Sequence, residues 1–218
     1  KKNIFSMLRA IKKLVHIIKS EKIDIVHARS RVPAWIAFFA CRQTQAVFIT
    51  TCHGYYSKHL FSRVMGWGKL VIVISEVIGQ HMVQDFGVSS HFVRIIARSV
   101  DMSKFNIPHK QKNSNDPYVV TMVGRITPLK GHAYFLKAMA QVARNIPDLK
   151  VQIIGDASAN RMGYKEELIV LTKRLGIAHL VDFMGNRRDI PQLLSHSDCL
   201  VLSTVTQEAF GRVILEAQ

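Results

Sequence analysis

Two glutamates near the end of the sequence, Glu208 and Glu216, are spaced so that both could face one ligand. The apolar segment 199–204 predicts a buried strand, Glu208 follows it in a polar turn, and a helix opening near Gly211 would carry Glu216 in its second turn. In open parallel α/β sheets, ligands bind where the strands end and helix N-termini point their free N–H groups. The pair suits hydroxyls on either side of a phosphate, those of a sugar and of a ribose. Taken by themselves, the two acids could also be a loop residue and a solvated helix residue.

A second candidate site combines two cations with glycines. Arg125 follows a predicted strand over 118–124, and Lys130 and Gly131 precede a helix expected from about 132 to 145. Backbone N–H groups at a helix N-terminus, together with Lys and Arg, would neutralise an anion such as a diphosphate. The turn is neither a P-loop nor a Gly-x-Gly-x-x-Gly turn, and an ordinary surface loop is the alternative.

The first half of the chain offers further candidates at strand ends. His53 follows the strand predicted over 46–52, and His27 and Arg29 stand at the end of the strand before it. Arg29 and Arg31 are candidates for binding an anionic acceptor, although His27 and Arg29 could also be structural.

Helices and strands alternate along the whole chain, which implies parallel pairing through right-handed crossovers. Ser75 and Gly87 are expected to cap one of the helices, and residues 55–67 are predicted to be a partly helical connection. We predict strands at 23–28, 46–52, 69–74, 92–97, 118–124, 149–155, 180–184 and 199–204, and helices at 3–20, 32–44, 76–86, 132–145, 163–175 and 189–196.

Composition narrows the class of protein. A chain of 218 residues with 48% hydrophobic and 21% charged residues is an ordinary globular sequence. The three cysteines are far apart in apolar runs, so they read as buried residues in a reducing compartment rather than as disulfides or metal ligands. The longest apolar run, 34–41, is shorter than the ~18 residues that span a bilayer, and no signal peptide opens the chain. We therefore expect a soluble or peripheral cytoplasmic protein.

The net charge of +15 is concentrated in the first half of the chain. Residues 1–115 contain 18 Lys and Arg against 5 Asp and Glu, a balance of +13, whereas 116–218 contain 12 against 10, a balance of +2. The first half could contact an anionic membrane or acceptor, or could present a solvated basic surface. No zinc-finger spacing, aromatic RNA-binding motif or basic zipper is present, so we expect no nucleic-acid partner.

Two of these motifs, in this order, resemble a known family. The Glu-x7-Glu spacing with Phe210 and Gly211 after the first acid, and the earlier run 123–131 with its Arg and Lys, resemble the retaining glycosyltransferases of family 4. The resemblance covers nearly the whole chain and implies an α/β, GT-B-like fold with two Rossmann-like parallel-sheet domains. It implies a partial acceptor domain over 1–107 and a partial donor domain over 118–218, and the polar segment 108–117 reads as a linker. Ser99 stands where the family usually has glycine, and the elements expected before residue 1 and after residue 218 are absent, so we expect a fragment lacking both ends.

The resemblance also implies a reaction. A sugar would pass, with retention, from a UDP- or GDP-linked donor to a glycan or lipid-linked acceptor of the cell envelope, such as lipopolysaccharide, at the inner face of the cytoplasmic membrane. No cofactor beyond the donor and no metal is expected, because no Asp-x-Asp occurs in the sequence. By this resemblance the catalytic residues are His53, Arg125, Lys130 and Glu208, and the donor is bound by Arg125, Lys130, Gly185, Arg187, Glu208, Phe210, Gly211 and Glu216.

Two other classes of protein remain open. A non-catalytic glycosyltransferase remnant that binds nucleotide or membrane without turnover would share every motif. An epimerase or phosphorylase on the same fold is the third possibility, but no lysine region for pyridoxal phosphate can be pointed to.

Overall fold

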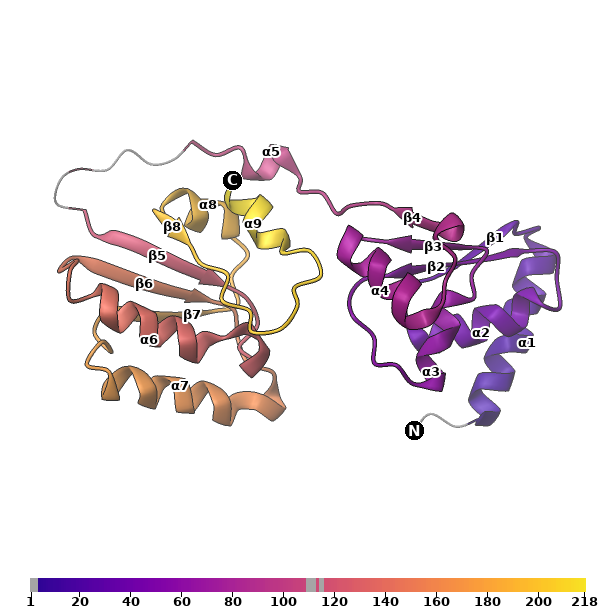
Figure 1. The fold of residues 1–218 in the computed structure, drawn as a ribbon, viewed down its shortest axis with the longest axis horizontal. Coiled ribbons are helices and arrows are strands. Elements are labelled where there is room, and N and C mark those ends of the chain that lie inside the picture. The colour runs from indigo at the N-terminus through magenta and orange to yellow at the C-terminus, as the bar shows by residue number, and fades with distance from the viewer. Residues whose placement is uncertain (1–3, 109–112, 114–115) are drawn as a thin grey trace. The chain divides into compact units, whose positions relative to one another are not determined.

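A computed structural model describes residues 4–108, 113 and 116–218. The chain forms two compact units that divide between Arg98 and Ser99, and each unit has its own four-stranded parallel sheet (Figure 1). The predicted fold class, two Rossmann-like parallel sheets, is therefore confirmed. The predicted linker over 108–117 falls largely outside the described residues, and the domain boundaries 1–107 and 118–218 stay predictions.

In unit 1 the strands pair in the order in which they occur, β1-β2-β3-β4. Such an order, with right-handed crossovers, brings the connecting helices to one face of the sheet. Its elements are α1 (Ile4–Ser20), β1 (Ile25–Ala28), α2 (Arg31–Cys41), β2 (Val47–Cys52), α3 (Leu60–Arg63), η1 (Val64–Gly66), β3 (Leu70–Val73), α4 (Glu76–Phe86), η2 (Ser90–Phe92) and β4 (Val93–Ile95).

The core of unit 1 lies on this one face of the sheet. Phe48, Val71 and Val73 are buried there, whereas Ile49 and Leu70, which point to the opposite face, are only partly buried. Since successive strand residues alternate between the two faces, the burial pattern identifies the face that the helices cover.

The predicted helix caps in unit 1 are confirmed. The backbone N–H of Ile78 donates to the Ser75 hydroxyl at the start of α4, and Gly87 ends this helix with a φ of 68°. In the connection 55–67 only α3 and η1, from Leu60 to Gly66, are helical. The predicted helix there is thus short.

In unit 2 the strand order is β7-β6-β5-β8, so the chain reverses its direction across the sheet between β7 and β8. Ligands in open α/β sheets bind beside such a reversal, at the carboxyl ends of the strands. The elements are α5 (Met102–Phe105), β5 (Tyr118–Val123), η3 (Pro128–Lys130), α6 (His132–Val142), β6 (Leu149–Ile154), η4 (Ala159–Arg161), α7 (Met162–Arg174), β7 (Val181–Gly185), α8 (Ile190–Ser195), β8 (Cys199–Leu200) and α9 (Arg212–Ala217).

The core of unit 2 fills the space between this sheet and the helices α6 and α7. Phe135 and Leu136 of α6 and Leu168 of α7 are at most 2% exposed and pack against the central strands β5 and β6. Burial of such side chains stabilises a domain by about 1.5–3 kcal/mol each. The loop that carries Arg125 and Lys130 therefore follows a buried central strand, β5.

The predicted strand over 199–204 is wrong beyond its start. Only Cys199–Leu200 forms β8, and the last ladder bond joins the Val201 N–H to the Thr121 carbonyl at 2.9 Å. After it the chain leaves the sheet, because the Val205 N–H donates to the Leu129 carbonyl at 3.0 Å instead of to a strand. The residues 201–205 thus follow the loop between β5 and α6.

Candidate functional site

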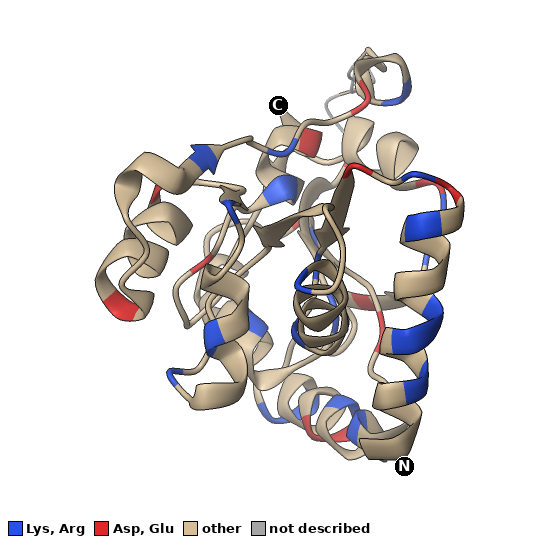
Figure 2. Ribbon diagram, turned by 90° about the vertical axis from the view of Figure 1, so that its right-hand side faces the viewer, with Lys and Arg blue, Asp and Glu red and all other residues tan. Residues whose placement is uncertain are grey.

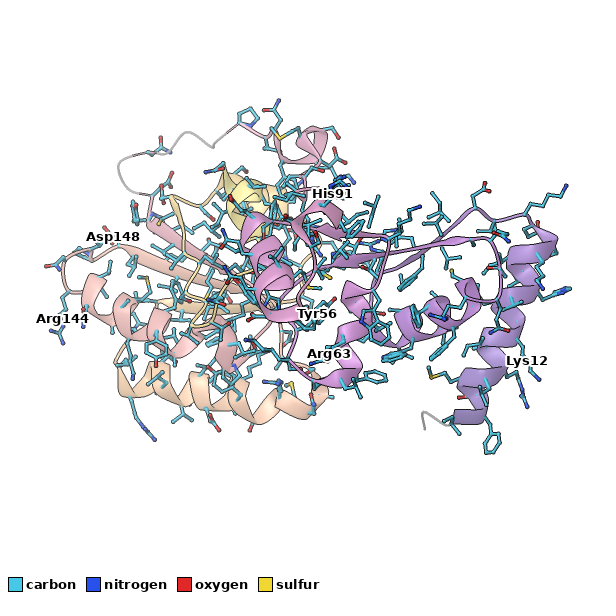
Figure 3. All side chains as sticks on the ribbon, turned by 45° about the vertical axis from the view of Figure 1, so that its right-hand side comes forward. Lys12, Tyr56, Arg63, His91, Arg144 and Asp148 are labelled. Atoms are coloured by element: carbon cyan, nitrogen blue, oxygen red, sulfur yellow. The ribbon has the colours of Figure 1, made fainter. Side chains whose placement is uncertain are left out.

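The pairing of β5 with β8 brings the two predicted motifs of unit 2 together. These strands are parallel, with Val120 opposite Cys199 and Thr121 opposite Leu200, so both chains leave the sheet at the same edge. The loop after β5 contains Arg125 and Lys130, and the segment after β8 contains Glu208. Arg144 and Asp148, labelled in Figure 3, belong to the α6–β6 connection at the opposite ends of the strands.

Lys130 and Glu208 form the centre of the site. The Lys130 Nζ lies 2.7 Å from Glu208 Oε2, and the two side chains are 29% and 31% exposed. The Thr204 hydroxyl lies between them, donating to Glu208 at 3.1 Å and accepting from Lys130 at 3.4 Å. A cation, a carboxylate and a hydroxyl from two strand ends thus share one partly open position.

The charge state of Glu208 follows from these neighbours. Burial alone would raise the pKa of its carboxyl, but the hydrogen bond and charge of Lys130 outweigh it, with help from Thr204 and the Gly211 backbone. The pKa of Glu208 is therefore below its usual value. The carboxylate remains ionised at neutral pH and can only accept hydrogen bonds, as from sugar hydroxyls.

Backbone contacts hold the two loops together. The Ser203 hydroxyl donates to the Lys130 carbonyl at 3.0 Å, next to the bond between Val205 and Leu129 described above. Gly131 has a φ of 74°, and a Cβ placed on it would lie 1.9 Å from the Ser203 carbonyl oxygen. Only glycine fits this approach, which explains the residue after Lys130.

Arg125 is placed differently from Lys130. Its backbone is fixed between β5 and β6, since the Gly124 N–H donates to Ile154 and the Ile126 N–H to Asp156. Its side chain is exposed, and among the described residues no hydrogen bond or ion pair holds it. Arg125 is thus a cation at the same sheet edge whose guanidinium is open to an incoming anion.

Glu216 does not join the Lys130 cluster directly. It lies on α9, where the Arg212 Nε donates to its Oε1 at 2.6 Å, and its side chain is only 9% exposed. Gly211, with a φ of 70°, precedes this six-residue helix, and Phe210 next to it is partly buried. The predicted ribose-binding role of Glu216 is not tested by these contacts.

Gly185 and Arg187 lie at the end of β7, at the same edge of the sheet. The Gly155 N–H donates to the Gly185 carbonyl at 2.8 Å, which ties the end of β7 to the end of β6. The Arg187 guanidinium makes two hydrogen bonds to Asp189, which lower the pKa of that acid. The ends of β5, β6, β7 and β8 thus form one row, and the role of Gly185 and Arg187 in base binding stays a prediction.

Some contacts were not predicted from the sequence. The sequence predicts that Ser203 and Thr204 belong to a strand, although two hydroxyl residues between a strand and an acid can also indicate a binding loop. His132, fully buried at the start of α6, is not among the predicted site residues, and burial lowers its pKa to about 4. The ring is therefore neutral at pH 7.

His53, the predicted catalytic residue of the first half, belongs to a separate cluster in unit 1. Arg29 donates through Nε to the His53 Nε2 at 3.0 Å, and the Arg98 Nη2 lies 3.1 Å from Nδ1. Burial, followed by the charges of Arg29, Arg98 and His27, lowers the pKa of His53. His27 lies within hydrogen-bond distance of the Thr51 hydroxyl, at 2.6 Å.

Arg31, the other predicted anion ligand, points elsewhere. It lies 3.3 Å from His59 and over the ring of Tyr56, 5.8 Å from its centroid. Arg31 thus packs on the β2–α3 connection and does not join the cluster of Arg29, His53 and Arg98.

The described residues contain neither a metal-binding group of side chains nor a membrane-spanning helix. No group of three or more His, Cys, Asp or Glu side chains in residues 4–108, 113 and 116–218 is arranged to hold a metal ion. Within the same residues, no helix has the length and hydropathy needed to cross a membrane.

Two family descriptions match the sequence and meet near the division of the units. Residues 103–218 match the family described as glycosyl transferases group 1, and residues 1–104 match glycosyltransferase family 4. The first match alone covers more than half of the chain and includes the whole row of strand ends in unit 2.

Curated relatives and solved structures agree with this match. The chain is 28% identical to an Escherichia coli enzyme named UDP-Gal:alpha-D-GlcNAc-diphosphoundecaprenol alpha-1,3-galactosyltransferase, over 98% of this chain and 60% of that protein. A glycosyltransferase structure from Rickettsia africae ESF-5 matches with a TM-score of 0.86 and 29% identity, over 100% of this chain and 61% of the other. Anabaena HepE in complex with UDP matches with a TM-score of 0.82 and 25% identity, over 95% and 60%. The chain thus spans about 60% of the length of these proteins.

Proposed function

Because the chain belongs to the group 1 glycosyltransferases, we propose that its unit 2 binds a nucleotide-diphosphate sugar and that the protein transfers this sugar to a glycan or lipid-linked acceptor. The observation that carries the proposal is the contact between Lys130, Thr204 and Glu208 at the ends of β5 and β8. It joins a phosphate-binding cation to an acceptor of hydroxyl hydrogen bonds, the two groups that the junction of sugar and diphosphate requires.

In this proposal, Arg125 and Lys130 bind the diphosphate and offset the negative charge that grows on it as the bond to the sugar breaks. In other folds a divalent metal performs this task. Arg125 supports the assignment because its guanidinium is open, whereas Lys130 would exchange part of its contact with Glu208 for the phosphate.

Glu208 would accept hydrogen bonds from the sugar hydroxyls, and its lowered pKa keeps it in the accepting form. Glu216 would hold the ribose, Phe210 and Gly211 would flank the phosphates, and the turn at Gly185 and Arg187 would contact the base. The donor would be a UDP or GDP sugar, and the solved relative with bound UDP supports the first of these.

We propose retention at the anomeric carbon. The bond from this carbon to the diphosphate oxygen breaks, and the bond to the acceptor oxygen forms on the same face. The proton of the acceptor hydroxyl passes to the departing phosphate oxygen, so no protein nucleophile is assigned. His53, neutral because its pKa is lowered, would act as a hydrogen-bonding group on the side of unit 1.

The proposed donor site can be tested with titration calorimetry of the chain with UDP and with GDP. An Arg125→Ala/Lys130→Ala variant removes two charge-assisted contacts, so its affinity for the nucleotide should fall at least about 100-fold. Lys137→Ala/Arg144→Ala is the matched control, because it removes the same charge from exposed positions of the same unit. Equal losses in both variants would refute the assignment, and binding without sugar transfer by the complete protein would identify a non-catalytic remnant.

We also propose that unit 1 contacts an anionic membrane surface, which would place the protein at the inner face of the cytoplasmic membrane. Helix α1 contains Arg9, Lys12, Lys13 and Lys19 and no acid, as the blue segments of Figure 2 show, and Lys12 points outward in Figure 3. Its residue Ile4 is 70% exposed. Such a helix is attracted to anionic lipids, by about 1 kcal/mol for each basic residue at the surface.

Vesicle co-sedimentation tests this membrane contact. Binding to phosphatidylcholine vesicles that contain phosphatidylglycerol should weaken about tenfold in Lys12→Gln/Lys13→Gln. The control Lys173→Gln/Arg174→Gln removes two charges from the end of α7 and should bind as the original chain does. Identical binding of both variants would contradict the proposal.

A further inference from the structure

We propose that Arg29, His53 and Arg98 form a binding site for a phosphate group of the acceptor substrate. The inference rests on the proposed function, because it names the chemistry of the acceptor for the same reaction. It does not follow from the donor-binding residues, all of which lie in unit 2.

The three residues come from three strand ends of one sheet. Arg29 directly follows β1, His53 directly follows β2, and Arg98 stands three residues after β4. Parallel strands end at the same edge of a sheet. The Ile96 N–H donates to the Val73 carbonyl, so the first residue after β4 is still bonded to β3. The cluster therefore has a rigid base at the edge of the sheet where ligands bind in such folds.

The donors and acceptors of this cluster do not match. His53 Nε2 accepts from the Arg29 Nε, so in a neutral ring the proton must be on Nδ1. The group that faces Nδ1 at 3.1 Å is the Arg98 guanidinium, which has only donors. Two donors therefore face each other, and moving the proton to Nε2 only transfers the conflict to Arg29.

The charge of the cluster is equally unbalanced. Among the described residues, neither Arg29 nor Arg98 is paired with a carboxylate. Protonation of His53 would add a third positive charge between them, and the pKa of His53 is lowered by both arginines as well as by burial. The missing partner must thus accept hydrogen bonds and carry negative charge.

A phosphate oxygen meets both requirements. Placed beside Arg98 and the His53 Nδ1–H, it would accept from both, and its charge would be balanced by the two guanidiniums. Arg is suited to such contacts because its planar donors match the oxygens of a phosphate group. A sugar hydroxyl could accept the unmatched hydrogen bonds but would leave two guanidiniums without a counter-charge.

The test uses inorganic phosphate and the ring signals of His53 in NMR spectra of isotope-labelled protein at constant pH and ionic strength. Phosphate should shift the His53 ring signals with saturation, and sodium chloride should not. Arg98→Gln and Arg29→Gln should weaken the phosphate affinity at least about tenfold, whereas Arg98→Lys should retain part of it. The control Arg94→Gln removes an exposed guanidinium of β4 that is bonded to the carbonyls of His91 and Val93, and it should not change the affinity.

Three outcomes separate this inference from the donor proposal. A phosphate-induced shift that persists unchanged in Arg98→Gln would overturn the inference, provided that the emission of Trp35 and Trp67 shows unit 1 folded. A shift lost in Arg125→Ala/Lys130→Ala but not in Arg98→Gln would also overturn it, since the phosphate would then occupy the donor site. Saturation that depends on Arg98 in a chain that fails to bind UDP or GDP would support the phosphate site while refuting the donor site.

Discussion

Replacing Gly131 by alanine should separate the two loops of the proposed donor site. The residue has a φ of 74°, and its Cβ would lie 1.9 Å from the oxygen and 2.9 Å from the carbon of the Ser203 carbonyl. Neither of these atoms belongs to a flexible side chain, so the backbone of one loop must move. Because Lys130 precedes Gly131 and Thr204 follows Ser203, the movement would pull apart the contact between Lys130 and Glu208.

The expected loss of stability has two parts. A left-handed conformation costs an alanine about 1–2 kcal/mol relative to glycine. Overpacking of a close contact adds about 1–3 kcal/mol, which gives a total of about 2–5 kcal/mol for Gly131→Ala. Gly176 provides the matched control in the same unit, because its φ is 71° but nothing lies within 4 Å of its Cβ position. Gly176→Ala should therefore show the first part alone.

Hydrogen exchange followed by mass spectrometry can measure these losses in peptides from β5 and β6, which report the opening of unit 2. Both tryptophans, Trp35 and Trp67, lie in unit 1, so their emission during urea unfolding serves as an internal control that should not change. Equal opening free energies for Gly131→Ala and Gly176→Ala would show that Ser203 does not approach Gly131 as described, and the argument for the joined loops would fail.

Three further predictions concern the same unit. Thr204→Val removes hydrogen bonds to Lys130 and Glu208 and should weaken UDP-sugar binding about fivefold or more in calorimetry, with recovery in Thr204→Ser. Glu208→Gln should change the free energy of unfolding in urea by less than about 1 kcal/mol, because the ion pair with Lys130 is partly exposed. The variant should retain its affinity for UDP but lose the extra affinity that the original chain has for UDP-sugar. Retention of that extra affinity would contradict the role of Glu208. The pKa of His132 is lowered from 6.5 to about 4, so the unfolded state takes up the proton first, and the stability of unit 2 should fall by up to about 3 kcal/mol as the pH falls from 6.5 to 4. Hydrogen exchange in β5 peptides should show this loss, and a His132→Leu variant with the same pH dependence would refute the assignment.

The sequence predicts the alternation of helices and strands in this protein well, because the buried parts of parallel strands have distinctive apolar runs. It also places Arg125 correctly after a strand and Lys130 correctly just before the next helix. The failure at 199–204 has a physical cause. Val201 and Leu202 are as apolar as strand residues, but beyond Val201 the chain follows the neighbouring loop, where the Val205 N–H donates to the Leu129 carbonyl. Only the tertiary structure decides between the two sets of hydrogen bonds.

The contact between Lys130 and Glu208 could not be predicted for a similar reason. The sequence identifies both residues as candidates, but the distance between them in space depends on β8 pairing with β5 rather than with a later strand. The same holds for Arg98, which nothing in its local sequence connects with His53. Pairings between strand ends determine which candidates share a site, and local patterns do not contain this information.

The cations of the two units differ in whether a carboxylate neutralises their charge, and this difference affects which anions they can bind. Lys130 has an internal counter-ion in Glu208, so an anion that also brings hydroxyl donors to Glu208, as a sugar diphosphate does, should bind there more tightly than one that does not. Such a site discriminates against simple anions, because they would bring a second negative charge to Glu208 and no donor. Arg29 and Arg98 have no carboxylate partner in the described part of unit 1, so a phosphate group alone suffices there. The electrostatics thus support the proposed nucleotide-sugar site in unit 2 and the proposed site in unit 1 for a phosphate group, irrespective of what it is attached to.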